Sequence, residues 1–388
     1  MAAREITPDA GQERLTDKES GADPSAAMYK RKDGKAGMGE LFEFDEIIDV
    51  RSPSEFQDDH VPGAISLPVL DDAERAMVGT LHKQSSAFDA KKVGAALVSR
   101  NIAHHLETYF LAKPRSYRPL IYCWRGGSRS GAMTTILRAI GWHAAQLEGG
   151  HKAYRHHVID ELTELPARFD FRVICGPTGV GKSRFLHAMQ ACNAQVLDLE
   201  DLAAHMGSVL GAYPARPQPS QKLFESRLWF ALRGFDPNKP VFVESESKKI
   251  GNLHTPEVLL QQMRASSCIN LHAEIPVRVE LLKQEYAHFL ASSDLLGKKL
   301  DCLIAIQGKQ QIETWKAMAI AGEWDELVAE LLIKHYDPAY TRSLARNFSK
   351  ALDANTLELT AADPATIKQL ALQLVNSIPA SDHNANFH

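Results

Sequence analysis

The stretch 119–132, PLIYCWRGGSRSGA, joins a short apolar run, a glycine-rich turn and the start of a helix. The strand predicted at 119–124 delivers Cys123 to the turn. The N–H groups of such a turn and the positive end of the helix that follows stabilise a thiolate. Arg125 and Arg129 add positive charge beside it. We therefore predict a reactive thiol. The alternative is a buried structural cysteine, which needs neither the two glycines nor the two arginines.

The sequence around this loop alternates predicted strands with predicted helices. Strands are predicted at 46–51, 63–68, 119–124 and 144–150, and helices at 71–79, 91–110 and 128–141. Such alternation is typical of a parallel sheet covered by helices on both faces. A helix predicted at 151–165 then runs toward a boundary at Pro166. We therefore predict a first α/β domain over residues 41–160.

A second motif, GPTGVGKS (176–183), fits the pattern G-x-x-x-x-G-K-[ST] between a predicted strand (169–176) and a predicted helix (182–192). Backbone N–H groups in such a loop cradle a phosphate, and Lys182 neutralises its terminal oxygens. The hydroxyl of Ser183 can reach a Mg²⁺ ion bound with the phosphate. Mg²⁺ is therefore a possible ligand of this loop, and no resident metal is assigned. The predicted phosphate-binding residues are Gly176, Thr178, Gly179, Gly181, Lys182 and Ser183. The motif specifies a phosphate or diphosphate group without identifying the molecule.

Acidic residues follow two strands of this second half. Glu244 and Glu246 end the buried run at 240–247, and Asp198 and Glu200 end the run at 194–200. Carboxylates at strand ends beside a phosphate loop can act with the bound phosphate and its cation. The alternative is that they cap helices or are solvated loop acids. Further strands are predicted at 267–275 and 356–361, a helix at 222–234 and a loop at 211–221. We predict a P-loop NTPase-like α/β domain with a helical C-terminal region over residues 166–388.

The composition narrows the class of protein. The 388 residues are 44% hydrophobic and 24% charged, with a net charge of −4, so any RNA contact must be local. No apolar run is long enough to cross a bilayer, and the amino terminus is not a secretory signal, so no membrane partner is expected. The 5 cysteines form no CxxC pair, which favours a reducing cytoplasm. Residues 1–40 are polar and charged and are predicted to be a disordered extension.

The cysteine loop and the segment IIDVRSPSEFQDDHVPGAISLP (47–68) together resemble the rhodanese family. Nearly the whole chain resembles the bacterial tRNA 2-selenouridine synthase family, in which a rhodanese domain precedes a P-loop domain. The resemblance runs from about residue 47 to 340. It rests on the segments IDVRSPSEF, DDAERAMVGTLHKQ, CWRGGSRS, LEGGHKAYR, GPTGVGKS, DLEDLAAHMGS, QPSQKLFE, VESESKKIGNLHTPE and HYDPAY.

This resemblance implies a transferase that modifies the wobble uridine, position 34, of tRNAs carrying 2-thiouridine. The tRNA sulfur is first alkylated by geranyl diphosphate, and selenium from selenophosphate then replaces the S-geranyl group to give 2-selenouridine. Cys123 is implied as an S-selanylcysteine intermediate, with Arg125 and Arg129 beside it. No tightly bound cofactor is expected, and a partner enzyme that supplies selenophosphate is a further expectation. Lys182 and the phosphate loop suit the release of diphosphate.

The tRNA must bind to basic residues despite the net negative charge. Lys152 and Arg155, in the cluster HKAYRHH that follows the cysteine domain, are the leading candidates, and a solvated helix face is the alternative. Two other functions remain open. One is a rhodanese sulfurtransferase fused to an ATP-dependent kinase or NTPase. The other is a non-enzymatic tRNA- or nucleotide-sensing module, which an intact Cys123 and a complete phosphate loop disfavour.

Overall fold

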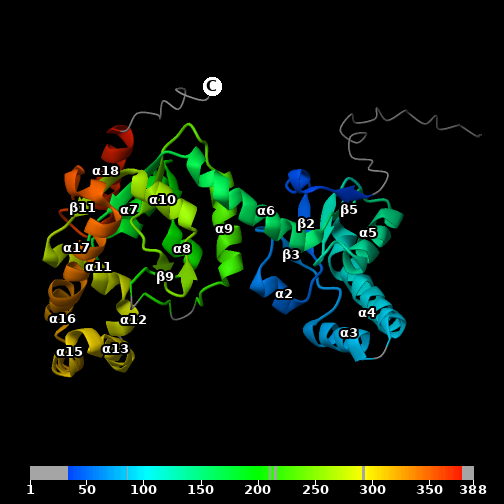
Figure 1. Cartoon of the computed structure of the whole chain (residues 1–388), viewed down its shortest axis with the longest axis horizontal. Helices are drawn as coiled ribbons and strands as arrows, with labels where there is room; N and C mark the ends of the chain where they lie inside the picture. The colour runs from blue at the N-terminus through cyan, green and yellow to red at the C-terminus, as the bar shows by residue number, and fades with distance from the viewer. Residues whose placement is uncertain (1–33, 85, 209–210, 214–215, 291–292, 378–388) are drawn as a thin grey trace, which may run out of the picture.

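The computed structural model describes residues 34–84, 86–208, 211–213, 216–290 and 293–377. Each half of the chain contains one five-stranded parallel sheet with helices around it. The alternation of strand and helix patterns in the sequence predicted this arrangement. Figure 1 shows the two α/β units side by side, with α6 running between them. The predicted fold class is confirmed. Within the described residues no helix is both long and apolar enough to span a membrane.

The first sheet has the strand order β1-β5-β4-β2-β3. Its strands are β1 (Lys35–Ala36), β2 (Glu46–Asp49), β3 (Ile65–Ser66), β4 (Pro119–Tyr122) and β5 (Ala145–Leu147). The helices around it are α2 (Pro53–Asp58), α3 (Asp72–Gln84), α4 (Ala87–Thr108) and α5 (Ser128–Ile140). Apolar side chains of the central strands, Ile48 and Ile121 among them, are fully buried against α4 and α5 in one core.

The boundary predicted at residue 40 is wrong. β1 pairs in parallel with β5, with Lys35 opposite Gln146 and Ala36 opposite Leu147. The side chain of Ala36 is buried in the core. A two-residue edge strand gives no periodicity, so the sequence pattern could not reveal it. The rest of the predicted extension, residues 1–33, lies outside the described residues.

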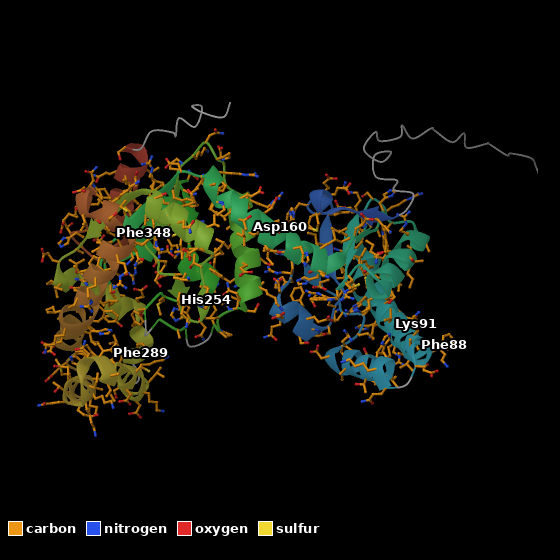
Figure 2. The ribbon with its side chains drawn as sticks, in the orientation of Figure 1. Phe88, Lys91, Asp160, His254, Phe289 and Phe348 are labelled. Atoms are coloured by element: carbon orange, nitrogen blue, oxygen red, sulfur yellow. The ribbon has the colours of Figure 1, made fainter. Side chains whose placement is uncertain are left out.

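Helix α6 (Gly150–Glu164) leaves the first domain and leads, through a short turn at Leu165–Arg168, into the second sheet. It packs against α9 (Gln221–Arg233) of the second domain. In Figure 2, Asp160 marks the stretch of α6 between the two domains, whereas Phe88 lies on α4 at the far end of the first. One continuous apolar cluster includes Tyr154 of α6 and Trp229 of α9, so the two domains share part of a core.

The second sheet has the strand order β12-β11-β6-β8-β7. Its strands are β6 (Phe171–Cys175), β7 (Gln195–Leu197), β8 (Val241–Glu244), β11 (Ser267–His272) and β12 (Thr356–Glu358). The helices α7 (Lys182–Ala191), α8 (Leu199–Ala203), α10 (Glu257–Ala265) and α18 (Pro364–Ser377) belong to this domain, as does a hairpin of β9 (Lys249–Ile250) and β10 (Leu253–His254). The phosphate loop follows β6, the middle strand of the sheet, which places it at the carboxyl edge where α/β proteins bind ligands.

The predicted helical region is inserted between β11 and β12. Its helices are α11 (Ile275–Glu285), α12 (Ala287–Leu290), α13 (Ser293–Leu300), α14 (Ile304–Gln307), α15 (Lys309–Ala321), α16 (Trp324–Leu331) and α17 (Asp337–Asn347). A π-helical turn at Leu332–Tyr336 joins α16 to α17. Trp315 and Leu327 are fully buried in a core of this region's own. Figure 1 shows α13, α15 and α16 together beside the second sheet.

Candidate active sites

Cys123 lies directly after β4, at the point where the loop turns toward α5. Its side chain is only 3% exposed, and its Sγ accepts two hydrogen bonds. The backbone N–H of Gly127 donates at 3.3 Å and the hydroxyl of Ser130 at 3.1 Å. Both donors stabilise a thiolate or a chalcogen anion attached to the sulfur. Ser130 is fully buried, and sequence reasoning did not single it out, although SRS in the loop contains it.

The loop keeps its shape because two glycine-containing turns interlock. Gly126 has a φ of 63°, and a Cβ there would come within 2.7 Å of the carbonyl oxygen of Leu147. Gly150, with a φ of 55°, approaches the loop so closely that a Cβ would overlap the Cys123 carbonyl. His151 N–H donates to that carbonyl at 2.8 Å. The first turn of α6 is therefore docked on the cysteine loop.

The two arginines of the loop differ. Arg129 donates to both carboxylate oxygens of Glu55 on α2, at 2.7 and 3.3 Å, so its charge is already compensated. Burial of Glu55 raises its pKa, but the hydrogen bond and charge of Arg129 outweigh this, and the pKa lies below its ordinary value. Arg125 is exposed. Trp124, next to Cys123 in the chain, is 40% exposed, and its ring stacks on His151 at 5.5 Å between centroids.

The phosphate loop runs from β6 into α7 with Gly179 and Gly181 at φ values of 80° and 83°. Nζ of Lys182 donates to the carbonyl of Gly176 at 3.0 Å. The hydroxyl of Ser183 donates to Oε2 of Glu200 at 2.6 Å. A cavity of about 320 Å³ opens above the loop, and its lining includes Thr178, Gly179, Gly181, Lys182, Ser183, Glu200 and Glu246. Most of the predicted phosphate-binding residues and two of the predicted acids therefore share one cavity.

The predicted acids divide into two groups. Asp198 accepts from Asp201 N–H at 2.8 Å and caps α8, as the alternative interpretation held. Glu244 is buried and accepts from Glu200 N–H at 3.0 Å. Burial is the largest cause of the raised pKa of Glu200, about 8, and the charge of Glu246 adds to it. Burial likewise raises the pKa of Glu246 and Glu244.

This group of carboxylates fits a divalent cation. Oε2 of Glu244 is buried with no hydrogen-bond partner among the described residues. Glu200 and Glu246 lie close together, since a Cβ on Gly207 would come within 2.6 and 2.7 Å of one oxygen of each. Carboxylate and hydroxyl oxygens are the ligands that Mg²⁺ prefers. Ser183, Glu200 and Glu246 are the residues that would hold it.

Residues far along the chain hold the phosphate loop in place, and sequence reasoning did not assign them. Arg278 of α11 is 4% exposed and donates to the Thr178 carbonyl from Nε at 3.0 Å and from a terminal nitrogen at 2.7 Å. Asp337 holds the other side of that guanidinium at 2.6 and 3.0 Å. Tyr340 Oη accepts from Gly176 N–H at 2.6 Å. Asp337 and Tyr340 belong to the segment HYDPAY, which was the available signal.

The prediction that Arg155 contacts RNA is wrong. Arg155 is 8% exposed and lies in the contact between α6 and α9. It donates to Glu225 at 2.6 Å and to the hydroxyl of Ser226 at 3.2 Å, and its Nε lies 3.5 Å from the buried carboxylate of Asp59. The guanidinium of Arg155 is therefore buried and paired with carboxylates between the domains, where RNA phosphates cannot reach it. Lys152, one helical turn earlier, is exposed.

A second cavity lies between the domains. Ser54, Gln57 and Asp58 line it from α2, while Arg216, Arg227 and the segment 217–220 line it from the other side. The cysteine site and the phosphate site are each connected to this cavity through one ion pair. Glu55, in the middle of the same α2, binds Arg129 of the cysteine loop, and Arg216 donates at 2.6 Å to Asp201, next to Glu200. The interdomain cavity, about 490 Å³ in volume, is therefore lined by segments that are connected to each candidate site.

Comparison with known proteins agrees with this arrangement. Residues 31–157 match the model of the rhodanese-like domain, and residues 169–299 match that of the tRNA 2-selenouridine synthase AAA domain. A tRNA 2-selenouridine synthase of Alcanivorax borkumensis is 34% identical over 77% of this chain and 90% of its own. Those of Nitrosomonas europaea and Bdellovibrio bacteriovorus are each 36% identical, over 62% and 66% of this chain. These two matches span 63% and 67% of the relatives' own lengths.

Proposed function

The chain belongs to the tRNA 2-selenouridine synthase family, and we propose that it converts 2-thiouridine at the wobble position of tRNA to 2-selenouridine in two steps at two sites. The main observation behind this proposal is that one chain contains both a loop with a hydrogen-bonded thiol and a phosphate loop. The two domains are connected by one helix, α6, and its first turn contacts the thiol loop. Neither motif alone specifies this reaction, since thiol loops and phosphate loops each serve many chemistries.

The first step is alkylation at the phosphate loop. The sulfur of 2-thiouridine attacks C1 of geranyl diphosphate, the C1–O bond breaks, and its electron pair leaves with the diphosphate while the uridine loses its N3 proton. Lys182 is placed to leave the Gly176 carbonyl and neutralise the departing oxygens. The loop amides hold the remaining charge. When bound at Ser183, Glu200 and Glu246, Mg²⁺ would add to that charge stabilisation.

The second step exchanges sulfur for selenium. In the net reaction a C2–Se bond forms, the C2–S bond breaks, and the S-geranyl group leaves as a thiolate with the bonding pair. A thioether leaves this carbon far more readily than a thiocarbonyl sulfur, which explains why alkylation comes first. Cys123 carries the selenium as S-selanylcysteine. The P–Se bond of selenophosphate breaks with release of phosphate, and the S–Se bond forms as a disulfide accepts two electrons and becomes a dithiol; when selenium has bonded to C2, the dithiol returns these electrons, the S–Se bond breaks and the Cys123 thiol is regenerated. The N–H of Gly127 and the hydroxyl of Ser130 hold the anionic form of the loaded sulfur. An enzyme that makes selenophosphate is the corresponding partner.

The tRNA is proposed to bind across the interdomain cavity. Arg227 lines this cavity, Lys152 is exposed on α6, and Trp124 offers an aromatic face on which a base can stack. Such a surface binds phosphates through local positive charge and an unpaired base through stacking, without a net basic protein. The wobble base can then reach either site from one bound tRNA.

The test of the first step is Lys182→Ala. We expect geranylation of thiolated tRNA to fall by about two orders of magnitude or more, because the developing diphosphate charge loses its main counter-charge. The reaction is followed by mass spectrometry of nucleosides from tRNA incubated with geranyl diphosphate. Lys309→Ala, an exposed lysine on α15, is the matched control and should be unchanged. Unchanged geranylation in Lys182→Ala would remove the phosphate loop from this step.

A further inference from the structure

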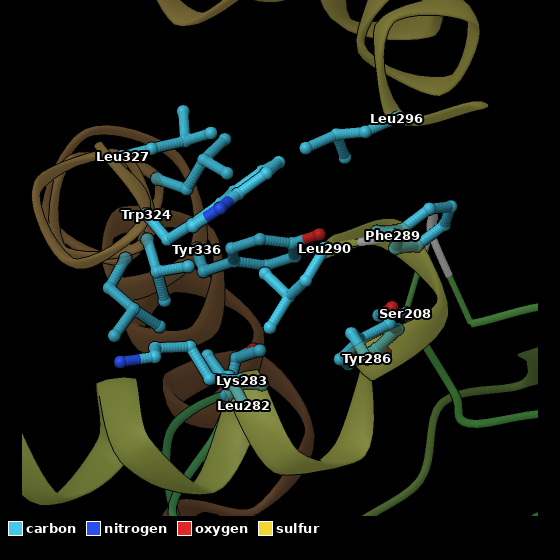
Figure 3. Close-up of a pocket in the computed structure, with 14 residues that line it drawn as sticks. Ser208, Leu282, Lys283, Tyr286, Phe289, Leu290, Leu296, Trp324, Leu327 and Tyr336 are labelled. Carbon is cyan, nitrogen blue, oxygen red and sulfur yellow. Dashed lines mark hydrogen bonds between the residues drawn. The ribbon is translucent and has the colours of Figure 1, made fainter. Parts of the chain in front are cut away.

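An apolar pocket lies within the helical region, beside the phosphate loop (Figure 3). It is formed by α11, α12, α13, α16 and the π-helical turn, so it belongs to the insertion between β11 and β12. Its apolar lining consists of Leu282, Phe289, Leu290, Leu296, Trp324, Leu327, Val328, Leu331 and Leu332. Leu327 and Leu332 are fully buried, and Leu296 and Leu331 are each 6% exposed. The pocket is narrow, about 60 Å³.

Three polar side chains of this pocket, Ser208, Tyr286 and Lys283, already have partners. The hydroxyls of Ser208 and Tyr286 lie 3.0 Å apart and bond each other. Nζ of Lys283 lies 2.6 Å from the carboxylate of Asp325 and, in Figure 3, points to the edge of the pocket. The one charged side chain of the lining is therefore compensated by Asp325, and most of the lining is apolar. Such a lining favours a hydrocarbon and disfavours a sugar or a nucleobase, whose polar atoms would lose their hydrogen bonds to water.

The pocket adjoins the cavity above the phosphate loop. Five residues, Thr178, Ser208, Leu282, Tyr286 and Tyr336, line both. The loop also packs directly on α11, because a Cβ on Gly179 would come within 2.6 Å of a Leu282 methyl. The larger cavity holds Lys182, and the smaller one extends from it into the helices. One end of a ligand spanning both is thus anionic and the other apolar.

We propose that this pocket binds the terpene chain of geranyl diphosphate while the phosphate loop holds its diphosphate; this inference rests on the proposed function and assigns the residues that choose the substrate. The isoprene unit next to the diphosphate lies in the shared part of the cavity, beside Leu282 and Tyr336. The distal unit enters between α13 and α16. Leu296 and Leu327 lie at the end opposite Leu282 in Figure 3, so they limit the length of the chain.

The length limit separates this substrate from nucleotides. ATP would place a ribose and an adenine where the structure offers mostly the apolar surfaces of leucine, phenylalanine and tryptophan side chains. A shorter prenyl chain would leave the distal part of the pocket empty and would bind less tightly, since each buried methylene contributes to affinity. The helical insertion thus gives the phosphate loop a preference for one class of diphosphate.

The experiment compares binding of geranyl diphosphate, dimethylallyl diphosphate and inorganic pyrophosphate to the full chain by calorimetry. We expect the wild-type protein to bind geranyl diphosphate at least about tenfold more tightly than pyrophosphate, because the chain is buried. In Leu327→Phe and Leu296→Phe the added volume should weaken geranyl diphosphate by about tenfold, while pyrophosphate changes less than about twofold. Dimethylallyl diphosphate should be affected less than geranyl diphosphate. Ile320→Phe, at a site 78% exposed on α15, is the control.

Two results would overturn the pocket assignment. One is equal affinity of the wild-type protein for geranyl diphosphate and pyrophosphate, which does not depend on any variant folding. The other is unchanged geranyl diphosphate affinity in both phenylalanine variants, with circular dichroism showing the wild-type fold. In either case the phosphate loop still binds pyrophosphate, so the proposed function stands. If the wild-type protein binds neither diphosphate, the first step of the proposed function fails together with the pocket.

Discussion

Glu200 accepts a hydrogen bond from the Ser183 hydroxyl at 2.6 Å, and its own backbone N–H donates to Glu244. The carboxylate of Glu246 lies close to that of Glu200. Three carboxylates gathered in a buried site repel one another when all are ionised, so the site favours a bound proton or a bound cation. The same oxygens that raise one another's pKa would coordinate Mg²⁺. The acidic cluster therefore binds either protons or a cation, and the two should compete.

This cluster predicts a pH-dependent stability. The pKa of Glu200 is raised from 4.5 to about 8, so its protonated form stabilises the fold fully below about pH 4.5, and that stability is lost as the pH rises through about 8. Without Mg²⁺, we expect the Tm to fall over this range. Added Mg²⁺ should raise the Tm more at the alkaline end, where the site is ionised. The measurement is thermal unfolding at several pH values with and without Mg²⁺.

Glu200→Gln provides the check on the cause. Because the amide does not titrate, its Tm should vary less with pH and respond less to Mg²⁺. Glu326→Gln, an exposed residue of α16, should behave as the wild-type protein does. A Mg²⁺ effect of the same size in Glu200→Gln would place the cation elsewhere.

At the scale of elements, α6 has two different faces. Arg155 faces α9 and Asp59, and Lys152 faces solvent. Replacing Arg155 by alanine leaves the fully buried Asp59 carboxylate short of a counter-charge, which costs about 3–5 kcal/mol when such a pair is broken. We expect Arg155→Ala to lower the Tm sharply. Lys152→Ala should leave the Tm unchanged, because an exposed lysine contributes little to stability.

The two variants should separate again in RNA binding. For Lys152→Ala, tRNA affinity should fall and the salt dependence of log Kd should become shallower by about 1, as expected when one phosphate contact is lost. Filter binding at several salt concentrations measures both quantities. For Arg155→Ala, protein that remains folded should keep the wild-type salt dependence. If Arg155→Ala made the salt dependence of log Kd shallower while its Tm stayed unchanged, Arg155 would contact RNA after all.

The elements differ in how far the sequence predicts them. The strands that deliver Cys123 and the phosphate loop, together with α5 and α7, follow from local patterns: apolar runs, glycines at turns and helical periodicity. β1 and the role of Arg155 do not, because each depends on a partner far along the chain, β5 for one and α9 for the other. The hydrogen bond from Arg278 to the phosphate loop joins residues 100 positions apart in the sequence, so local patterns could not predict it either.

The apolar pocket shows the same limit. Leu282, Leu296 and Leu327 each lie on amphipathic helices that read as ordinary core-forming elements. Only the packing of these helices around the phosphate loop leaves a space between them. Sequence patterns predict which residues are buried, and they do not predict where burial is incomplete.

At the scale of the whole molecule, the chain places a thiol site and a phosphate site on separate domains with an interdomain cavity between them. α6 starts on the cysteine loop and leads into the strand that carries the phosphate loop, and the buried contacts of Arg155 and Ser226 with Asp59 hold the domains together. Under the proposed function, an S-geranylated tRNA formed at the phosphate site would meet selenium at the thiol site without leaving the protein. The proposed function thus assigns the two steps to two sites.

The most direct measurement is the nucleoside content of tRNA treated by Cys123→Ser with geranyl diphosphate and then selenophosphate. Geranylation uses the tRNA sulfur as nucleophile, so this variant should form S-geranyl-2-thiouridine and no 2-selenouridine, whereas Cys302→Ser, at an exposed thiol, should form both. Mass spectrometry after digestion detects each product, and circular dichroism checks the fold. Selenation at the wild-type level by Cys123→Ser would contradict a cysteine carrier, and loss of both products in the folded variant would contradict two separate sites.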